Sequence, residues 1–284
     1  MTEIKAFSQS DAWAETVRLL QQAPIVAPRG MRVREIPERY AVRIEAPQVG
    51  FVDVDGRDLN YAILAAEATS LLGQTSVPEA IVDRVQAFAK FTDGGVFWGA
   101  YGPRIAGDLP KLVQLLQEDP DSRQAVLTLY DSRRDLLRGV KDVPCTVAIQ
   151  FFLRDDLTRP TKDGYQKRLH MWVVMRSNDA WLGLPYDLGQ FSVLQGAVAA
   201  ALGVKVGAYT HSVGSMHLYE RDWEKASKVG KPRDPNSTPP GLHLGGAPDI
   251  ESASRRARRI LLGQGDDLDE TSTLDRWLAS ELAG

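Results

Sequence analysis

Residues 170–187 of the chain, HMWVVMRSNDAWLGLPYD, join a strand-like run to the start of a helix. The apolar and β-branched side chains of residues 170–176 are typical of a strand. Gly183 and Pro185 indicate the turn that follows, and residues 188–203 place their apolar side chains on one helical face. This strand–turn–helix segment therefore carries a group of polar residues on each side of its turn.

The remaining sequence alternates irregularly between helical and strand-like patterns. A helix capped by Ser10 or Asp11 is expected first, because Trp13, Val17 and Leu20 share one helical face. Further helices are predicted at residues 60–72, 111–118 and 273–282, and strands at residues 40–47, 125–130, 146–153 and 208–219. Because these elements do not follow a strict β-α-β order, they favour an α+β fold over a doubly wound parallel sheet.

The composition indicates a soluble globular protein, since 43% of the 284 residues are hydrophobic and 25% are charged. Residues 229–249 are crowded with Pro and Gly and are predicted to form a loop. No comparable linker divides residues 25–225. We therefore expect residues 1–284 to form a single domain.

The net charge of −3 gives no general attraction to nucleic acid or to an anionic membrane. The basic cluster at residues 255–259 continues into an apolar run, which indicates the solvated start of an element rather than a nucleic-acid-binding arm. No apolar run is long enough to cross a bilayer, and the polar N-terminus lacks the layout of a secretory signal. A single cysteine excludes an internal disulfide, and the four histidines show no metal-ligand spacing. The expected location is cytoplasmic, with no metal, no nucleic-acid partner and no membrane partner.

Glu67 lies on the apolar stripe of the helix predicted at residues 60–72, because Ile63, Leu64 and Leu71 share its face. A carboxylate in that position must be paired, protonated or directed into a cavity. A buried ion pair with an arginine explains such a residue as well as a catalytic function does. Glu67 by itself leaves both interpretations open.

Cys145 directly follows Pro144 and precedes the strand predicted at residues 146–153. Most free cysteines are small apolar residues without reactivity. Its position at the start of a strand, beside a turn-forming proline, favours a reactive thiol. Arginines from other segments would help to ionise such a thiol.

Several polar residues also have ordinary structural explanations. Ser177 and Asp179 are common turn formers, and Asp187 suits the N-cap of the helix that follows it. Arg29, within a Pro-Arg-Gly sequence, fits a turn in the same way. None of these residues identifies a function by itself.

Together these segments resemble the thymidylate synthase superfamily. Residues 144–151 are similar to the family's nucleophile segment, in which Pro-Cys precedes a strand containing Gln-Phe. Residues 176–187 match the family's Arg-Ser-x-Asp-x-x-Leu-Gly-x-Pro-aromatic-Asn signature at nearly every position. Residues 217–219 are similar to its His-x-Tyr, and residues 121–123 to its Ser-Arg-Arg. The resemblance covers about residues 25–225 and implies an α+β sandwich that forms a homodimer.

The resemblance implies that Cys145 attacks C6 of a pyrimidine base and that Glu67 organises water and moves protons. Tyr101 is similar to the family's active-site tyrosine, and Asp179 would contact the pterin of a folate. Addition of a thiolate at C6 makes C5 nucleophilic, so that C5 can accept a one-carbon unit from the co-substrate 5,10-methylenetetrahydrofolate. These four residues are the expected catalytic group.

The resemblance also assigns the contacts to the nucleotide. Planar guanidinium groups suit a phosphate because they bind its oxygens in pairs. The residues expected at the phosphate are Arg29, Arg123, Arg176 and Ser177. Arg123 would be contributed across the dimer. His217 and Tyr219 would bind the 3′-hydroxyl group of the sugar.

Asp187 stands where thymidylate synthases carry Asn, and this departure predicts the base. A carboxyl group accepts a hydrogen bond from the N4 amine of cytosine and, when protonated, also donates one to N3. While ionised it offers O4 of uracil no donor, and the opposed acceptors cost roughly 1–3 kcal/mol. The substitution is similar to that of the deoxycytidylate hydroxymethylases, the branch in which water ends the reaction.

The sequence thus predicts folate-dependent 5-hydroxymethylation of a cytidine monophosphate, with dCMP favoured. A hydroxymethylase that prefers CMP and a C5 methylase are alternatives within the same family. A sensor that binds nucleotide without catalysis is an alternative of another class, since Gln124, Thr146 and Ser215 depart from the family's residues. The retention of both Cys145 and Glu67 argues against a sensor.

Overall fold

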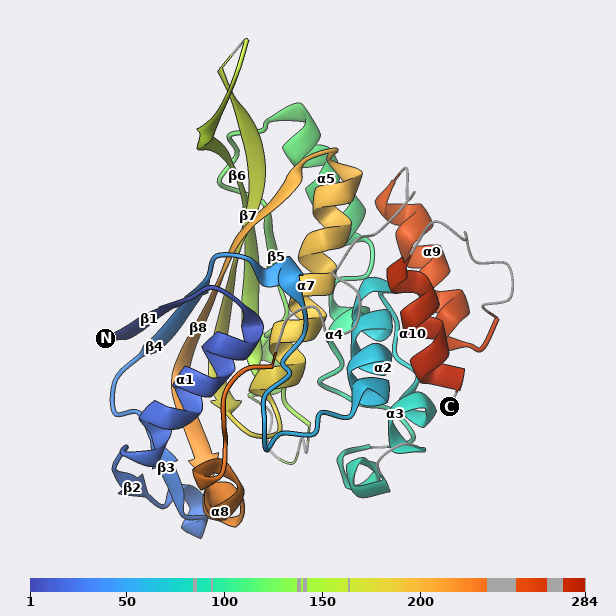
Figure 1. Ribbon diagram of the computed structural model, residues 1–284. Coiled ribbons are helices and arrows are strands. Elements are labelled where there is room, and N and C mark those ends of the chain that lie inside the picture. Colours follow the sequence, from blue (N-terminus) through green and yellow to red (C-terminus); the bar gives the residue numbers. More distant parts are fainter. Residues whose placement is uncertain are drawn as a thin grey trace.

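The computed structural model describes residues 1–83, 86–92, 94–136, 139, 142–162, 164–233, 249–264 and 273–283. Within these residues eight strands form one mixed sheet, and the longer helices lie on one side of it (Figure 1). This arrangement confirms the α+β fold predicted from the sequence. Most of the predicted loop at residues 229–249 lies outside the described residues, because only residues 229–233 and 249 belong to them.

The sheet has the strand order β1-β4-β8-β7-β6-β5. β1 (Thr2–Ala6) is parallel to β4 (Tyr40–Ile44), and β4 is antiparallel to β8 (Lys205–Tyr219). A small antiparallel pair, β2 (Ile25–Val26) and β3 (Val33–Glu35), joins the end of β8 through β3. The strand predicted at residues 208–219 is therefore present as β8, which begins three residues earlier, at Lys205.

The other half of the sheet is a long hairpin. β6 (Thr146–Thr161) and β7 (Gly164–Asp179) are antiparallel, and β5 (Val126–Thr128) pairs with the outer edge of β6. β7 is parallel to β8, so the ends of these two strands lie together. Both hairpin strands are longer than predicted because their polar ends pair with each other beyond the apolar core (Figure 1). Cys145 directly precedes β6, and Asp179 is the last residue of β7.

Helices stack on the sheet in successive layers. α7 (Leu184–Ala201) packs on β7 and β8, with α1 (Gln9–Gln21) beside it. α2 (Tyr61–Leu72) packs on α7, and α9 (Ile250–Leu261) and α10 (Thr273–Ala283) lie on the far side of α2 (Figure 1). The helix that carries Glu67 is thus enclosed between α7 and the two C-terminal helices.

Further helices connect these elements. They are α3 (Pro78–Val82), α4 (Tyr101–Arg104), α5 (Asp108–Glu118), α6 (Ser132–Asp135) and α8 (Trp223–Ser227). α4 begins at Tyr101 and contacts α2, which brings Tyr101 to the same region as Glu67.

The predicted cap of the first helix is wrong by two residues or more. Ser8 caps α1, since its side chain accepts a hydrogen bond from the Asp11 backbone N–H. The Asp11 carboxylate accepts one in return from the Ser8 N–H. This reciprocal pairing satisfies two helix-end donors, so both Ser10 and Asp11 belong to the first turn and neither is the cap.

Asp187 is not the N-cap of α7. The helix begins at Leu184 with Gly183 as its cap, so Asp187 lies in the first turn and is buried. Its side chain bonds to Asn178 and Gln190 and not to the free N–H groups of the helix end. The capping interpretation is therefore wrong, and the carboxyl group has another role.

The basic cluster at residues 255–259 was predicted to lie at the start of an element. It lies instead in the middle and last turn of α9. Arg256 Nε donates to Asp275 Oδ2 of α10 at 2.9 Å, and Arg258 Nε donates to the carbonyl of Gly73. Cations near a helix C-terminus are also favoured by the helix dipole. These contacts hold α9 against α10 and the end of α2.

In the described part of the chain, no helix combines the length and the apolar character that a bilayer span requires.

Candidate active site

Cys145 lies between the start of β6 and the guanidinium group of Arg176 on β7. Arg176 donates from Nε to the Pro144 carbonyl and from Nη2 to the Val143 carbonyl, both at 3.0 Å. Nη2 also lies 3.7 Å from Cys145 Sγ. These hydrogen bonds fix the residues directly before Cys145 and thereby hold its sulfur in place.

Burial and the charge of Arg176 act in opposite directions on the acidity of the Cys145 thiol. Burial raises the pKa of Cys145, the nearby Arg176 lowers it, and Asp187, Asp142 and Asp179 raise it again. The balance lies above the ordinary value. Arg176 thus supplies the expected positive charge, but burial has the larger effect on the pKa of Cys145.

Glu67 is a carboxyl group with a strongly altered acidity. Burial raises the pKa of Glu67 to about 8, and the negative charge of Asp187 contributes to the rise. Among the described residues no positive charge offsets this burial. The ion-pair interpretation is thus not supported, and a group with this pKa exchanges its proton near neutral pH.

Asp187 faces Glu67 from the first turn of α7. Its Oδ2 accepts a hydrogen bond from Asn178 Nδ2, and its Oδ1 accepts one from Gln190 Nε2, both at 3.0 Å. Burial raises the pKa of Asp187 to about 7, although both amide groups act to lower it. Two carboxyl groups with pKa values near neutrality therefore lie close together.

Tyr101 completes this group of titratable side chains. Its hydroxyl oxygen accepts a hydrogen bond from the Thr146 N–H at 3.3 Å, and its ring stacks on Phe191 at 5.9 Å between centroids. Burial raises the pKa of Tyr101, and the charges of Asp187 and Cys145 add to the rise. The structure thus brings Cys145, Glu67, Tyr101 and Asp187 together from four separate segments. Such a cluster of perturbed groups is typical of an active site.

Residues 95–257, more than half of the chain, match the family model described as thymidylate synthase. This chain belongs to the thymidylate synthase family. It is 29% identical over 223 residues to a deoxyuridylate hydroxymethyltransferase of Bacillus phage SP01, a match that covers 72% of this chain and 55% of that protein. It is 33% identical over 182 residues to a protein of the same name from Pseudomonas phage M6, covering 61% and 48% of the two chains. The chain spans about half the length of the curated relatives it matches.

Membership of the thymidylate synthase family agrees with the prediction from the sequence. The resemblance also assigned residues at the ends of β7 and β8. Ser177 and Asp179 are at the end of β7, opposite Ser215 and His217 of β8. Asp179 accepts hydrogen bonds from the Trp181 and Leu182 N–H groups through Oδ1, and from Arg221 Nη2 through Oδ2. Asp179 therefore shapes the turn into α7, as its turn-forming character predicted.

His217 and Tyr219 are neighbours on the end of β8. Their rings form an edge-to-face contact with 5.1 Å between centroids, and Arg221 lies 4.3 Å from the centre of the Tyr219 ring. His217 is buried, with Nδ1 3.3 Å from the Ser215 carbonyl. The two residues adjoin Asp179, which places the predicted sugar-binding pair beside the end of β7.

Arg29 and Arg123 are not among the described contacts of Cys145. Arg29 is exposed in a 3-10 turn, where its φ of 53° is left-handed. Arg123 is exposed next to β5, and its carbonyl accepts a hydrogen bond from Gln150 Nε2. Their assigned roles at the phosphate therefore stay predictions.

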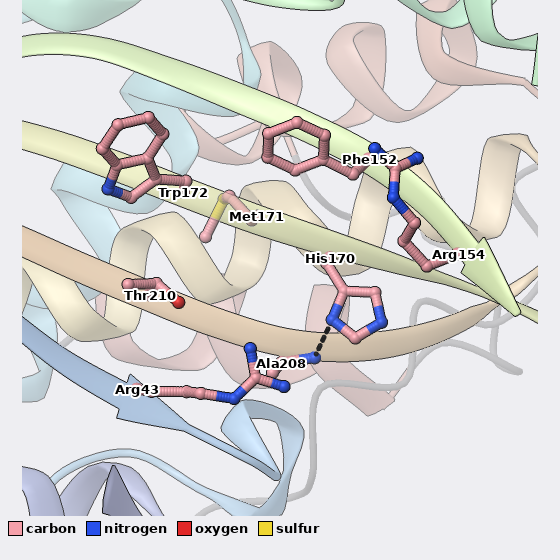
Figure 2. Close-up of a pocket in the computed structure, with 8 residues that line it drawn as sticks. All are labelled: Arg43, Phe152, Arg154, His170, Met171, Trp172, Ala208 and Thr210. Carbon is pink, nitrogen blue, oxygen red and sulfur yellow. Dashed lines mark hydrogen bonds between the residues drawn. The ribbon is translucent and has the colours of Figure 1, made fainter. Parts of the chain in front are cut away.

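A hollow of about 500 Å³ lies elsewhere, on the face of the sheet opposite the helices. Figure 2 shows Phe152, His170, Trp172 and Thr210 around it, with Arg43 and Arg154 at its sides. None of the catalytic candidates lines it. This hollow is thus separate from the candidate active site of the thymidylate synthase fold.

The sequence interpretation missed three residues that contact the site. Asn178, His211 and Gln190 form a buried polar group next to Asp187. Signals for two of them were present. His211 shares the buried face of β8 with Tyr209 and Val213. Gln190 lies three residues after Asp187 on the same helix.

Glu67→Gln is expected to stabilise the protein at pH 8 and to leave its stability nearly unchanged at pH 5. The folded pKa of about 8 lies above the unfolded value of 4.5, so the wild-type free energy of unfolding falls as pH rises between these values. A neutral amide removes this loss, which is on the order of 4 kcal/mol at pH 8. Thermal unfolding at both pH values measures the difference, with a shift of about 2–4 °C per kcal/mol.

Glu118→Gln is the matched control, since Glu118 is exposed on α5. Its melting temperature should follow that of the wild type at both pH values. Equal stabilisation by Glu67→Gln at pH 5 and pH 8 would contradict the raised pKa of Glu67.

Proposed function

We propose that this chain catalyses folate-dependent 5-hydroxymethylation of a cytidine monophosphate, with dCMP favoured over CMP. One observation carries the proposal: the buried carboxyl group of Asp187 lies beside Glu67, Tyr101 and Cys145 in a thymidylate synthase fold. The nucleophile, a proton-transfer group and a base-reading group then share one site.

Cys145 is the proposed nucleophile. Its thiolate adds to C6 of the base, and the electron pair of the C5–C6 double bond makes C5 nucleophilic. Arg176 stabilises the thiolate from 3.7 Å and, with Ser177, binds the nucleotide phosphate. Because the thiol is held mostly protonated, its proton must leave as the nucleotide binds.

The sugar and the rest of the phosphate are assigned to residues near the strand ends and at the surface. His217 and Tyr219 bind the 3′-hydroxyl group, with the buried His217 ring fixed by its contact with Tyr219. Arg29 approaches the phosphate from its exposed turn, and Arg123 serves the active site of a second subunit.

The 5,10-methylenetetrahydrofolate would supply a carbon at the oxidation level of formaldehyde. Asp179 Oδ2 has one hydrogen bond, from Arg221, and keeps acceptor capacity for the N–H groups of a pterin. Leu182, which is 51% exposed three residues further on, offers apolar contact to its rings. These residues therefore fit a folate, because Asp179 offers an acceptor to the pterin N–H groups and Leu182 offers apolar contact.

Glu67 is proposed to move the proton of the water that ends the reaction. With a pKa of about 8 it can accept that proton at neutral or mildly alkaline pH. Asp179 is a weaker candidate for this task, because both of its carboxylate oxygens hold the turn and Arg221.

Two features bear on the base. The ionised carboxylate of Asp187, fixed by two amide donors, accepts a hydrogen bond from the N4 amine of cytosine. The named activity of both phage relatives is toward deoxyuridylate. Protonated Asp187 can also serve uracil, since it donates to O4, and its pKa of about 7 makes that state accessible. Hydroxymethylation of dUMP is therefore the second candidate.

The test is to incubate the protein with dCMP, formaldehyde and tetrahydrofolate and to measure the nucleotide mass. A gain of CH2O supports hydroxymethylation. A gain of CH2 would replace it with methylation and leave the one-carbon transfer intact. Parallel reactions with CMP and dUMP determine the sugar and the base.

We also propose a homodimer that forms through the open face of the sheet. Trp172 is 39% exposed there and stands with Phe152 at the hollow of Figure 2, away from the helices. An aromatic surface of this kind suits an isologous contact with a second copy. Arg123 is exposed, and its carbonyl accepts a hydrogen bond from Gln150 Nε2 of β6; we propose that its side chain reaches across this interface.

Trp172→Asp is expected to weaken dimerisation by about 30-fold or more, because it replaces a central aromatic contact with a charge. Sedimentation velocity over a concentration series measures the shift to monomer. Leu262→Asp is the control, since Leu262 is 57% exposed at the end of α9 on the helical side. A Trp172→Asp protein with wild-type dimerisation would argue against this interface.

A further inference from the structure

The amide group of Asn178 connects the base-reading carboxyl group to the interior of the sheet. Its Nδ2 lies 3.0 Å from Asp187 Oδ2, 3.0 Å from His211 Nε2 and 2.9 Å from Met175 Sδ. An amide nitrogen has two hydrogens and no acceptor capacity. The two strong acceptors, the carboxylate and the imidazole nitrogen, therefore take its hydrogens, and the thioether is a weak third contact.

This arrangement fixes the proton on His211. Because Nε2 accepts from Asn178, the single proton of the neutral ring is on Nδ1, which lies 2.7 Å from the hydroxyl oxygen of Tyr209. His211 is fully buried, and burial lowers its pKa to about 3, so the ring is neutral. Tyr209 thus holds the tautomer of His211 in which Nε2 is free to accept.

The other side of the amide shows that its orientation is imposed. Asn178 Oδ1 is buried without a hydrogen-bond partner among the described residues. It packs on Gly183, where an added Cβ would lie 2.7 Å from Oδ1. A buried carbonyl without a donor is unfavourable by itself, so the contacts of Nδ2 must hold the group in this orientation.

We infer that His211 is a positioning residue for base recognition: by accepting from Asn178, it turns the amide NH2 toward Asp187 and keeps that carboxyl group a hydrogen-bond acceptor. This inference rests on the proposed function. An acceptor at this point selects the N4 amine of cytosine over O4 of uracil. With the amide reversed, its oxygen would face Asp187, which would then have to be protonated and could donate to O4.

The titratable and polar groups around the hydrogen-bonded residues His211, Asn178 and Asp187 come from four elements. Glu67 of α2 and Tyr101 of α4 interact with Asp187 electrostatically. Burial raises the pKa of Tyr209 of β8, and the charges of Asp187 and Tyr101 add to the rise. Gln190 of α7 donates to Asp187 Oδ1 independently of His211. Loss of His211 should therefore weaken discrimination between the bases without removing the carboxyl group from its place.

The test measures the dissociation constants of dCMP and dUMP by isothermal titration calorimetry, without folate. His211→Phe removes the acceptor and Tyr209→Phe frees the histidine to protonate Nε2. Each is expected to reduce the preference for dCMP by about tenfold, mainly through tighter dUMP binding. His211→Gln, whose amide oxygen can accept near the position of Nε2, should restore most of the preference.

Tyr40→Phe is the control, because Tyr40 is another fully buried tyrosine whose hydroxyl bonds to Thr16 away from Asp187. Its preference should equal that of the wild type. If His211→Phe does not fold, Tyr209→Phe carries the test, since it conserves volume. An unchanged preference in the folded variants overturns the inference.

The outcomes also separate this inference from the proposed function. A wild type that converts dCMP with folate but binds dCMP and dUMP equally refutes the inference and leaves the transferase activity standing. A wild type that binds neither nucleotide contradicts the proposed function itself.

Discussion

Cys145→Ser is expected to lower turnover of the preferred nucleotide by at least about 1,000-fold. A serine hydroxyl does not ionise near neutral pH and is a far weaker nucleophile than a thiolate. The substitution keeps the size of the side chain, so the contact with Arg176 and the loop that it holds should survive. Release of tritium from [5-³H]dCMP measures the addition step, and product mass measures complete turnover.

Nucleotide affinity is the internal control for Cys145→Ser, because the chain has no second cysteine to mutate. Affinity for dCMP should stay within about threefold, since the phosphate and base contacts come from other residues. Turnover above a tenth of the wild-type rate would exclude the sulfur as nucleophile. A wild type that binds dCMP yet releases no tritium would instead support the nucleotide sensor.

Asp187→Asn is expected to shift the ratio of kcat/KM for dCMP over dUMP toward dUMP by about 100-fold or more. The ionised carboxylate opposes O4 of uracil, whereas an amide can donate to O4 and accept from N3–H. Asn178 and Gln190 both donate to this position, so one of their amides must turn to admit the new donor. Competition assays with both nucleotides give the ratio directly.

The pH dependence of the same ratio provides a second measurement. The pKa of Asp187 is raised to about 7, so its carboxyl group is mostly protonated below that pH and can donate to O4. The wild-type preference for dCMP should therefore increase as pH rises through 7, and Asp187→Asn should remove this dependence. Asp53→Asn is the control, since Asp53 is a buried aspartate paired with Arg233 outside the site. A ratio that Asp187→Asn leaves unchanged would refute the base assignment.

Much of the fold was predictable because it depends on local patterns. The alternation in residues 170–176 and the apolar face of residues 188–203 identified β7 and α7. The boundaries were less accurate where tertiary contacts decide them. The capping box at Ser8 depends on a reciprocal bond, and the hairpin extends because two polar strands pair with each other.

The candidate site was predictable to a different degree for each residue. Glu67 was conspicuous as a carboxylate on an apolar stripe, and Cys145 by its place before a strand. Asp187 was given a capping role that the structure contradicts, since its environment is set by the side chains of Asn178 and Gln190. Local sequence cannot give that environment, because Asn178 reaches the site from β7.

The sequence by itself determined the family and the α+β elements. It also identified the thiol of Cys145, the carboxylate of Glu67 on an apolar helix face, and Asp187 where the family carries asparagine. Periodicity and motif spacing are properties of residues near one another in the sequence, and can therefore be read without the tertiary structure. Only the tertiary structure decided which charges face one another. It enclosed Glu67 partly and Asp187 fully, raised both pKa values toward neutrality and brought His211 into contact with Asn178. These results depend on the packing and register of segments far apart in the chain, because burial and hydrogen bonding are set by tertiary contacts.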